Sequence, residues 1–213
     1  MNKDKLLSIA LYLAIITILY NIIEGVVSVM FGYEDETLAL FGFGLDSFVE
    51  VISGIGVLHM VIRMKTTNIE KHDNFEKTAL KITGTAFYIL AVGLIVGSLL
   101  NIIYDIKPTT TLVGIIVSFV SIITMYFLMK AKLKIGNELK SDAIIADANC
   151  TKACFYLSFI LLASSGLYEI FGIAYLDILG ALGISYFAYK EGKEAFEKVN
   201  SDTLSCCSSC DNH

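Results

Sequence analysis

Long apolar segments dominate this chain and leave few folds open to it. A helix that crosses a bilayer needs about 20 mainly apolar residues. The candidate segments are Leu6–Phe31, Thr37–Ile62, Thr78–Ile103, Thr111–Met129, Ala143–Gly166 and Leu176–Ala188. Of the 213 residues 55% are hydrophobic and only 17% are charged, which is more apolar than an ordinary soluble domain. The sequence therefore predicts an all-α integral membrane protein with six transmembrane helices, the last of them short in its apolar part.

Basic residues gather on one side of this predicted topology. They precede the first segment or follow the second, fourth and sixth: Lys3, Lys5, Arg63, Lys65, Lys71, Lys77, Lys130, Lys132, Lys134, Lys140, Lys190, Lys193 and Lys198. The opposite side carries only Lys107 and an acidic loop, GYEDET, whose Thr37 is expected to cap the second helix. Because cytoplasmic loops are enriched in Lys and Arg, both termini are predicted to be cytoplasmic.

The connections between segments are too short to hold a second folded domain. We therefore predict one six-helix transmembrane domain over residues 1–199 and a Cys-rich cytoplasmic tail without fixed structure over 200–213. The tail contains four side chains that can bind a soft metal: Cys206, Cys207, Cys210 and His213. Incidental or lipidated thiols are an equally good interpretation of this tail.

Two pairs of potential metal ligands lie inside the second and fifth segments. Asp46 and Glu50 are four residues apart, as are Cys150 and Cys154, so each pair occupies one face of its helix. A rise of about 1.5 Å per residue places both pairs near the middle of the membrane. Ionisable groups are costly at that depth and are candidates for function. Two carboxylates and two thiolates can form a tetrahedral site for a borderline or soft divalent cation.

Each pair taken alone also has a structural interpretation, and other polar residues have supporting roles. A buried cysteine often serves as a small hydrophobic residue, and an acid can simply bond a neighbouring helix. Asp147 is expected to guard the cytoplasmic entrance or to cap the fifth helix, and Asn149 to support a ligand. Lys152 could pair with an acid such as Glu24, and Asn21 with Glu24 could line the outward path.

These motifs resemble those of the cation diffusion facilitator family of divalent-metal transporters. TLALFGFGLDSFVEV keeps the register of the family's Asp-x-x-x-Asp motif with Asp46 and Glu50. SDAIIADANC follows the family's fifth span, with Cys150 and Cys154 where that span has His and Asp. The resemblance implies six spans, cytoplasmic termini and a metal site at mid-membrane between spans two and five. Thiol ligands depart from the family pattern, and the cytoplasmic dimerisation domain of many members is expected to be missing.

The sequence thus predicts a secondary transporter and not an enzyme. It would export Zn²⁺, or alternatively Cd²⁺ or another soft divalent ion, across a prokaryotic plasma membrane with protons as the counter-ion. No nucleotide-binding motif is present, and no nucleic-acid partner is expected. Gly93 and Gly97, with Gly84, make the third segment a candidate homodimer surface.

Two other functions remain open at this point. The chain could be a membrane metal sensor or metal-binding protein that does not transport. It could also be a thiol oxidoreductase that uses Cys150 and Cys154, although thiols one helical turn apart are poorly placed for an unstrained disulfide.

Overall fold

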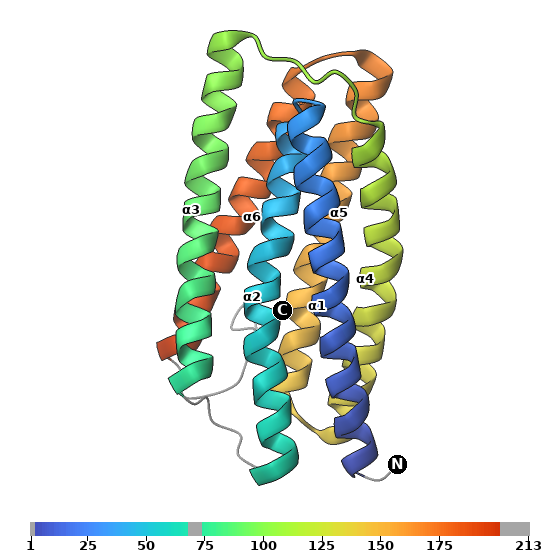
Figure 1. Ribbon diagram of the computed structural model, residues 1–213, viewed down its shortest axis with the longest axis vertical. Helices are drawn as coiled ribbons and strands as arrows, with labels where there is room; N and C mark the ends of the chain where they lie inside the picture. The colour runs from blue at the N-terminus through green and yellow to red at the C-terminus, as the bar shows by residue number, and fades with distance from the viewer. Residues whose placement is uncertain (1–2, 68–73, 201–213) are drawn as a thin grey trace, which may run out of the picture.

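All the regular structure in the described part of the chain is α-helical. The computed structural model describes residues 3–67 and 74–200. Its helices are α1 Lys3–Glu34, α2 Leu38–Thr67, α3 Asn74–Tyr104, α4 Leu112–Leu139, α5 Asp142–Phe171 and α6 Tyr175–Asn200 (Figure 1). The predicted all-α fold is confirmed. Most helices extend beyond the predicted apolar segments, because a helix can continue on charged residues once it leaves the lipid.

Among the described residues, five helices are long and apolar enough to cross a membrane, which confirms an integral membrane protein. These segments are Lys5–Glu34, Leu38–Arg63, Lys77–Tyr104, Leu112–Leu139 and Asp147–Phe171. In α6 the charged residues that begin at Lys190 shorten the apolar stretch. This helix, with 26 residues the shortest one described, nevertheless packs within the bundle.

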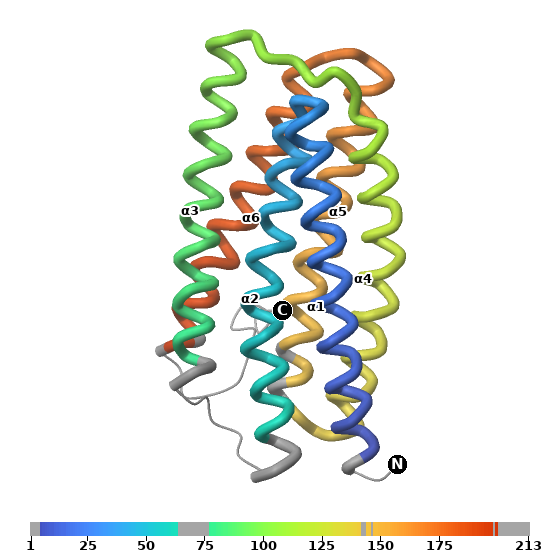
Figure 2. Tube along the Cα trace, in the orientation of Figure 1, coloured from blue at the N-terminus to red at the C-terminus, as the bar shows by residue number. Residues whose placement is uncertain are grey.

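The helices form a group of four with a pair at its side. Helix α1 packs mainly on α2 and α4 mainly on α5, and the contacts α1–α4 and α2–α5 close the group. Helices α3 and α6 pack on each other, and α2 and α5 join this pair to the group (Figure 1). Helix α1 begins, and α2, α4 and α6 end, at the lower end of Figure 2. We call this the basic end, and the positive-inside rule predicts that it faces the cytoplasm.

Glycines bring α1 and α2 unusually close together. A Cβ on Gly32 would lie 2.5 Å from the backbone nitrogen of Phe41, and one on Gly44 would lie 2.7 Å from that of Val29. Small residues at a membrane helix interface permit such close backbone approach. The tight α1–α2 pair thereby sets polar side chains of α1 beside those of α2 within the bundle.

A buried carboxylate of α6 caps the start of α2. Asp177 is only 1% exposed, and its oxygens accept hydrogen bonds from the backbone N–H groups of Leu38 at 2.8 Å and Ala39 at 3.2 Å. The prediction that Thr37 caps α2 is wrong: its hydroxyl instead donates to the Thr110 carbonyl at 3.2 Å. Asp177 comes from a different helix and accepts bonds from N–H groups that have no acceptor within α2. Its negative charge also interacts favourably with the positive end of the α2 dipole.

Replacing Asp177 with alanine should destabilise the bundle by about 1–2 kcal/mol, the usual loss for a helix cap. Two backbone N–H groups of α2 would lose their acceptor in a buried setting. Unfolding in detergent followed by circular dichroism would measure the loss. Glu34→Ala is the matched control, because Glu34 is exposed at the same end of the bundle. Equal stability of the two variants would contradict the capping role.

Two of the three glycines of α3 contact other helices of the same chain. Gly84 faces Phe196 and Gly97 faces Leu38, at 2.9 Å and 3.1 Å from where a Cβ would be. Around Gly93 no atom of the described residues lies within 4 Å of that position. Of the three glycines, only Gly93 thus faces open space, and a homodimer through α3 stays a prediction.

Candidate cation site

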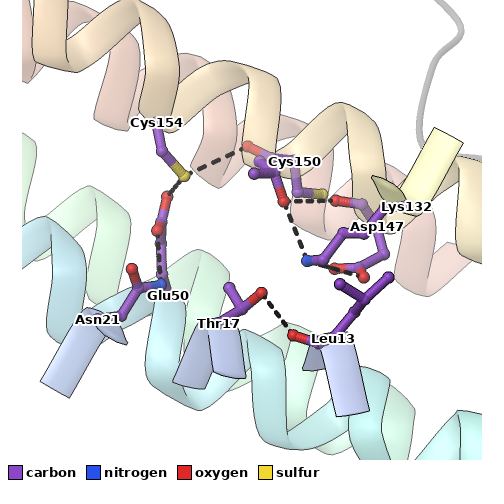
Figure 3. A network of polar contacts seen from close by, with 9 residues as sticks. Leu13, Thr17, Asn21, Glu50, Lys132, Asp147, Cys150 and Cys154 are labelled. Carbon is purple, nitrogen blue, oxygen red and sulfur yellow. Dashed lines mark hydrogen bonds and ion pairs between the residues drawn. The ribbon is translucent and has the colours of Figure 1, made fainter. Parts of the chain in front are cut away.

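Two of the four predicted ligands meet inside the bundle. The Cys154 thiol of α5 donates a hydrogen bond to Glu50 Oε1 of α2 (Figure 3). From α1, Asn21 Nδ2 donates to the other carboxylate oxygen, Oε2, at 2.9 Å. Cys154 is 5% exposed and packs beside Met125, so this contact lies within the core of the four-helix group. A carboxylate, a thiol and an amide from three helices therefore converge at one point.

The other two predicted ligands lie one helical turn away from this contact. Asp46 is 2% exposed, and no described residue donates a hydrogen bond to its Oδ1. Cys150 is half-buried, and its backbone carbonyl oxygen lies 3.4 Å from Cys154 Sγ, within hydrogen-bond distance of that thiol. Neither Cys150 nor Cys154 forms a disulfide with a described residue. Within residues 3–67 and 74–200, no three His, Cys, Asp or Glu side chains are grouped as metal ligands, so the four-ligand site stays a prediction.

A cavity of about 60 Å³, lined by both polar and apolar residues, adjoins the Glu50–Cys154 contact. Its walls come from all six helices: Thr17, Asn21, Glu50, Ser53, Gly54, Leu80, Thr83, Phe87, Lys132, Asp147, Cys150, Thr151, Cys154, Glu191 and Ala195. A water molecule needs about 10–15 Å³ of such space, so the cavity has room for several waters or a hydrated cation. Most of these residues lie nearer the basic end than Glu50 does, so the cavity extends toward that end.

On the other side of Glu50, beyond the buried carboxylates of Asp46 and Glu24, the bundle has an apolar core. Phe43, Leu157 and Leu161 are at most 2% exposed and pack in the main hydrophobic core. Toward the loops of that end, Glu169 of α5 accepts hydrogen bonds from the Thr111 backbone N–H at 3.1 Å and its hydroxyl at 3.0 Å. The structure therefore has a cavity on the basic-end side of Glu50 and, on the opposite side beyond the buried carboxylates, a closed apolar core.

A buried ion pair forms one wall of the cavity. Lys132 Nζ lies 3.0 Å and 2.9 Å from the two carboxylate oxygens of Asp147, and it donates to Thr151 Oγ1 at 3.0 Å (Figure 3). Lys132, counted in the sequence among the basic residues that follow the fourth segment, is 2% exposed, because α4 continues to Leu139 and Lys132 faces the bundle interior. Asp147 cannot cap α5, which starts at Asp142, and instead pairs with Lys132 inside the bundle.

Another buried carboxylate, that of Glu24, lies between α1 and α2. Glu24 is 6% exposed and accepts hydrogen bonds from the Tyr20 hydroxyl at 2.8 Å and the Ser47 hydroxyl at 3.1 Å. Lys152 does not pair with Glu24, since it is exposed and its ammonium lies 5.9 Å from the ring centre of Tyr156. The sequence drew attention to Glu24 only as a charge inside a span. Its hydrogen-bond partners, Tyr20 on α1 and Ser47 on α2, could be identified only from the way the helices pack.

The remaining predicted residues lie away from this centre. Asn149 is half-buried on α5 and does not line the cavity. The accessory ligands proposed in the tail fall outside the described residues: Cys206, Cys207, Cys210 and His213.

The fold and the cavity define a polytopic membrane protein that buries charged side chains beside an internal cavity. The chain is similar to an uncharacterized transporter, MJ0449, of Methanocaldococcus jannaschii, with 26% identity over 182 residues. That alignment covers 83% of this chain but 63% of the relative, so the chain spans less than two thirds of the relative's length. No family model matches the chain. This distant homology supports a role in transport and leaves the substrate open.

Proposed function

We propose that this chain is a transporter of the cation diffusion facilitator type. It exports a borderline or soft divalent cation, Zn²⁺ or Cd²⁺, from the cytoplasm in exchange for protons. One observation carries the proposal: a carboxylate of α2 and a thiol of α5, Glu50 and Cys154, meet inside the bundle next to a cavity. The similarity to a protein named as a transporter agrees with transport as the activity.

The chemistry of this contact suits exchange of a cation for protons. A thiol holds a metal only after it loses its proton, and carboxylates must likewise be ionised, so metal binding releases protons. The cation would take the position of the proton that Cys154 now shares with Glu50. Asp46 and Cys150, one turn away on the same two helices, would turn toward it to complete four ligands. Asn21 would hold Glu50 in place from α1.

The arrangement of polar and apolar regions suits loading from the basic end. A cation would enter through the cavity beside Lys132 and Asp147 and reach Glu50. Release on the opposite side requires that the apolar core around Phe43 and Leu161 open. In the alternating-access mechanism, one group of helices tilts against another around the fixed site. The close α1–α2 and α4–α5 pairs are natural rigid units for such a motion.

The proposal predicts a selectivity order for transport. Purified protein in sealed liposomes should take up Cd²⁺ and Zn²⁺ and exclude Mg²⁺ and Ca²⁺, because thiolate ligands select softer metals. Cys154→Ser should lower Cd²⁺ uptake by about tenfold or more, the loss expected when a ligand group is weakened. A panel of divalent ions, with protein-free liposomes as the blank, measures both effects. Uptake of Mg²⁺ at the rate of Cd²⁺, or parent-like uptake by Cys154→Ser, would defeat the proposal.

A further inference from the structure

Three carboxylates inside the bundle, those of Glu24, Asp46 and Glu50, have no cationic partner among the described side chains. Glu24 and Asp46 are 6% and 2% exposed, and Glu50, one turn from Asp46 on α2, accepts a hydrogen bond from the buried Asn21. Among the described residues none of the three forms an ion pair, and the buried ammonium of Lys132 is held by Asp147. Buried carboxylates must be neutralised by protons or by bound cations.

Two buried oxygens beside these carboxylates accept no hydrogen bond from any described residue. They are Asp46 Oδ1 and Asn21 Oδ1, on side chains only 2% and 1% exposed. In Figure 3 the Asn21 amide nitrogen points to Glu50, and no dashed line reaches its oxygen. Buried acceptors are nearly always satisfied in native proteins, so each unsatisfied one calls for a partner.

We propose that these oxygens form a second cation site, between α1 and α2, for a hard cation such as Na⁺. Its ligands are the carboxylates of Glu24 and Asp46, the amide oxygen of Asn21 and the hydroxyl of Ser47. Ser47 is already 3.1 Å from Glu24 and 2% exposed. Hard cations take carboxylate, amide and hydroxyl oxygens and have little affinity for thiols. A single proton bridges only two acceptors, whereas one cation can gather all of these oxygens.

Asp46 belongs to both the oxygen-only site and the predicted divalent site with the thiols. One carboxylate cannot serve two cations fully, so occupation of either site weakens the other. Such negative coupling is reciprocal, and it is the thermodynamic basis of exchange. This step rests on the proposed function, but binding of a hard cation near Glu24 does not.

The test measures the two sites separately in the full chain. Cys206, Cys207 and Cys210 are first changed to serine, so that the tail does not bind the probe metal. Calorimetric titration with CdCl₂ is done in NaCl, in MgCl₂ and in choline chloride at equal ionic strength. Na⁺ should weaken Cd²⁺ binding about fivefold or more, the usual range of coupling between sites. Glu24→Gln should abolish this dependence and keep Cd²⁺ binding. A Mg²⁺ effect instead of a Na⁺ effect would identify the hard cation as divalent.

A second readout does not depend on Cd²⁺. NaCl or MgCl₂ should raise the thermal unfolding midpoint of the parent above that in choline chloride, because a ligand stabilises the state that binds it. Glu24→Gln should lose this rise, and Ser47→Ala, which removes one neutral oxygen, should reduce it. If both salts act on the parent and on Glu24→Gln alike, or on neither, the second site is refuted. If Cd²⁺ does not bind but the salt effect depends on Glu24, the proposed function fails and this site stands.

Discussion

Replacing Glu50 with glutamine should abolish divalent-cation transport while the bundle stays folded. Glutamine has the size of glutamate, and its amide oxygen can still accept one of the bonds that Asn21 and Cys154 now donate. The substitution removes the negative charge that offsets the cost of moving a divalent cation from water into the membrane interior. Loss of a ligand charge should lower Cd²⁺ uptake by about two orders of magnitude. That is the upper end of the losses seen when residues that only hydrogen-bond to metal ligands are replaced. Flux into liposomes measures this.

Glu138→Gln is the matched control for this variant. Glu138 is exposed near the end of α4 at the basic end, so its charge lies outside the cavity. It should transport like the parent. Circular dichroism and the thermal unfolding midpoint of Glu50→Gln show whether its helices are intact. A folded Glu50→Gln protein that transports at the parent rate would remove the main support for a site between α2 and α5.

The contact between Glu50 and Cys154 could be anticipated in part, because the residue spacing and segment length that indicate it are local features of the sequence. Helix geometry turns a four-residue spacing into a shared face, and apolar length fixes how deep each residue lies. Both properties can be read from a single stretch of sequence. Which two helices face each other is not local, and here it came from resemblance to a transporter family. The structure then brought together one member of each pair and left Asp46 and Cys150 a turn away.

Residues whose role depends on packing between distant segments could not be assigned in this way. Asp177 caps α2 across 139 positions of sequence, so no capping motif near Thr37 could have revealed it. Lys132 carries the composition of a basic loop, but a helix that continues to Leu139 turns it into the bundle. Glu24 stood out as a charge in an apolar run, and only the close α1–α2 approach shows that it bonds Ser47.

Replacing Lys132 with methionine should destabilise the fold by about 3 kcal/mol or more, because removing one partner of a buried ion pair leaves the other charge unpaired. Asp147 would lose its only ion-pair partner among the described residues, in a setting where it is 14% exposed. Chemical unfolding in detergent measures the loss. Lys190→Met is the control: its pair with Glu194 spans 3.9 Å at a 48% exposed lysine, so it should cost less than about 1 kcal/mol.

The double variant Lys132→Met with Asp147→Leu separates charge from packing. Replacing a buried ion pair with apolar groups of similar size is often neutral or stabilising, because the cost of burying both charges disappears. Stability should therefore return toward that of the parent. A double variant as unstable as Lys132→Met alone would mean that the lysine acts through its packing and its bond to Thr151. Restored stability with lost cation uptake would mean that the bundle retains this ion pair for transport rather than for folding.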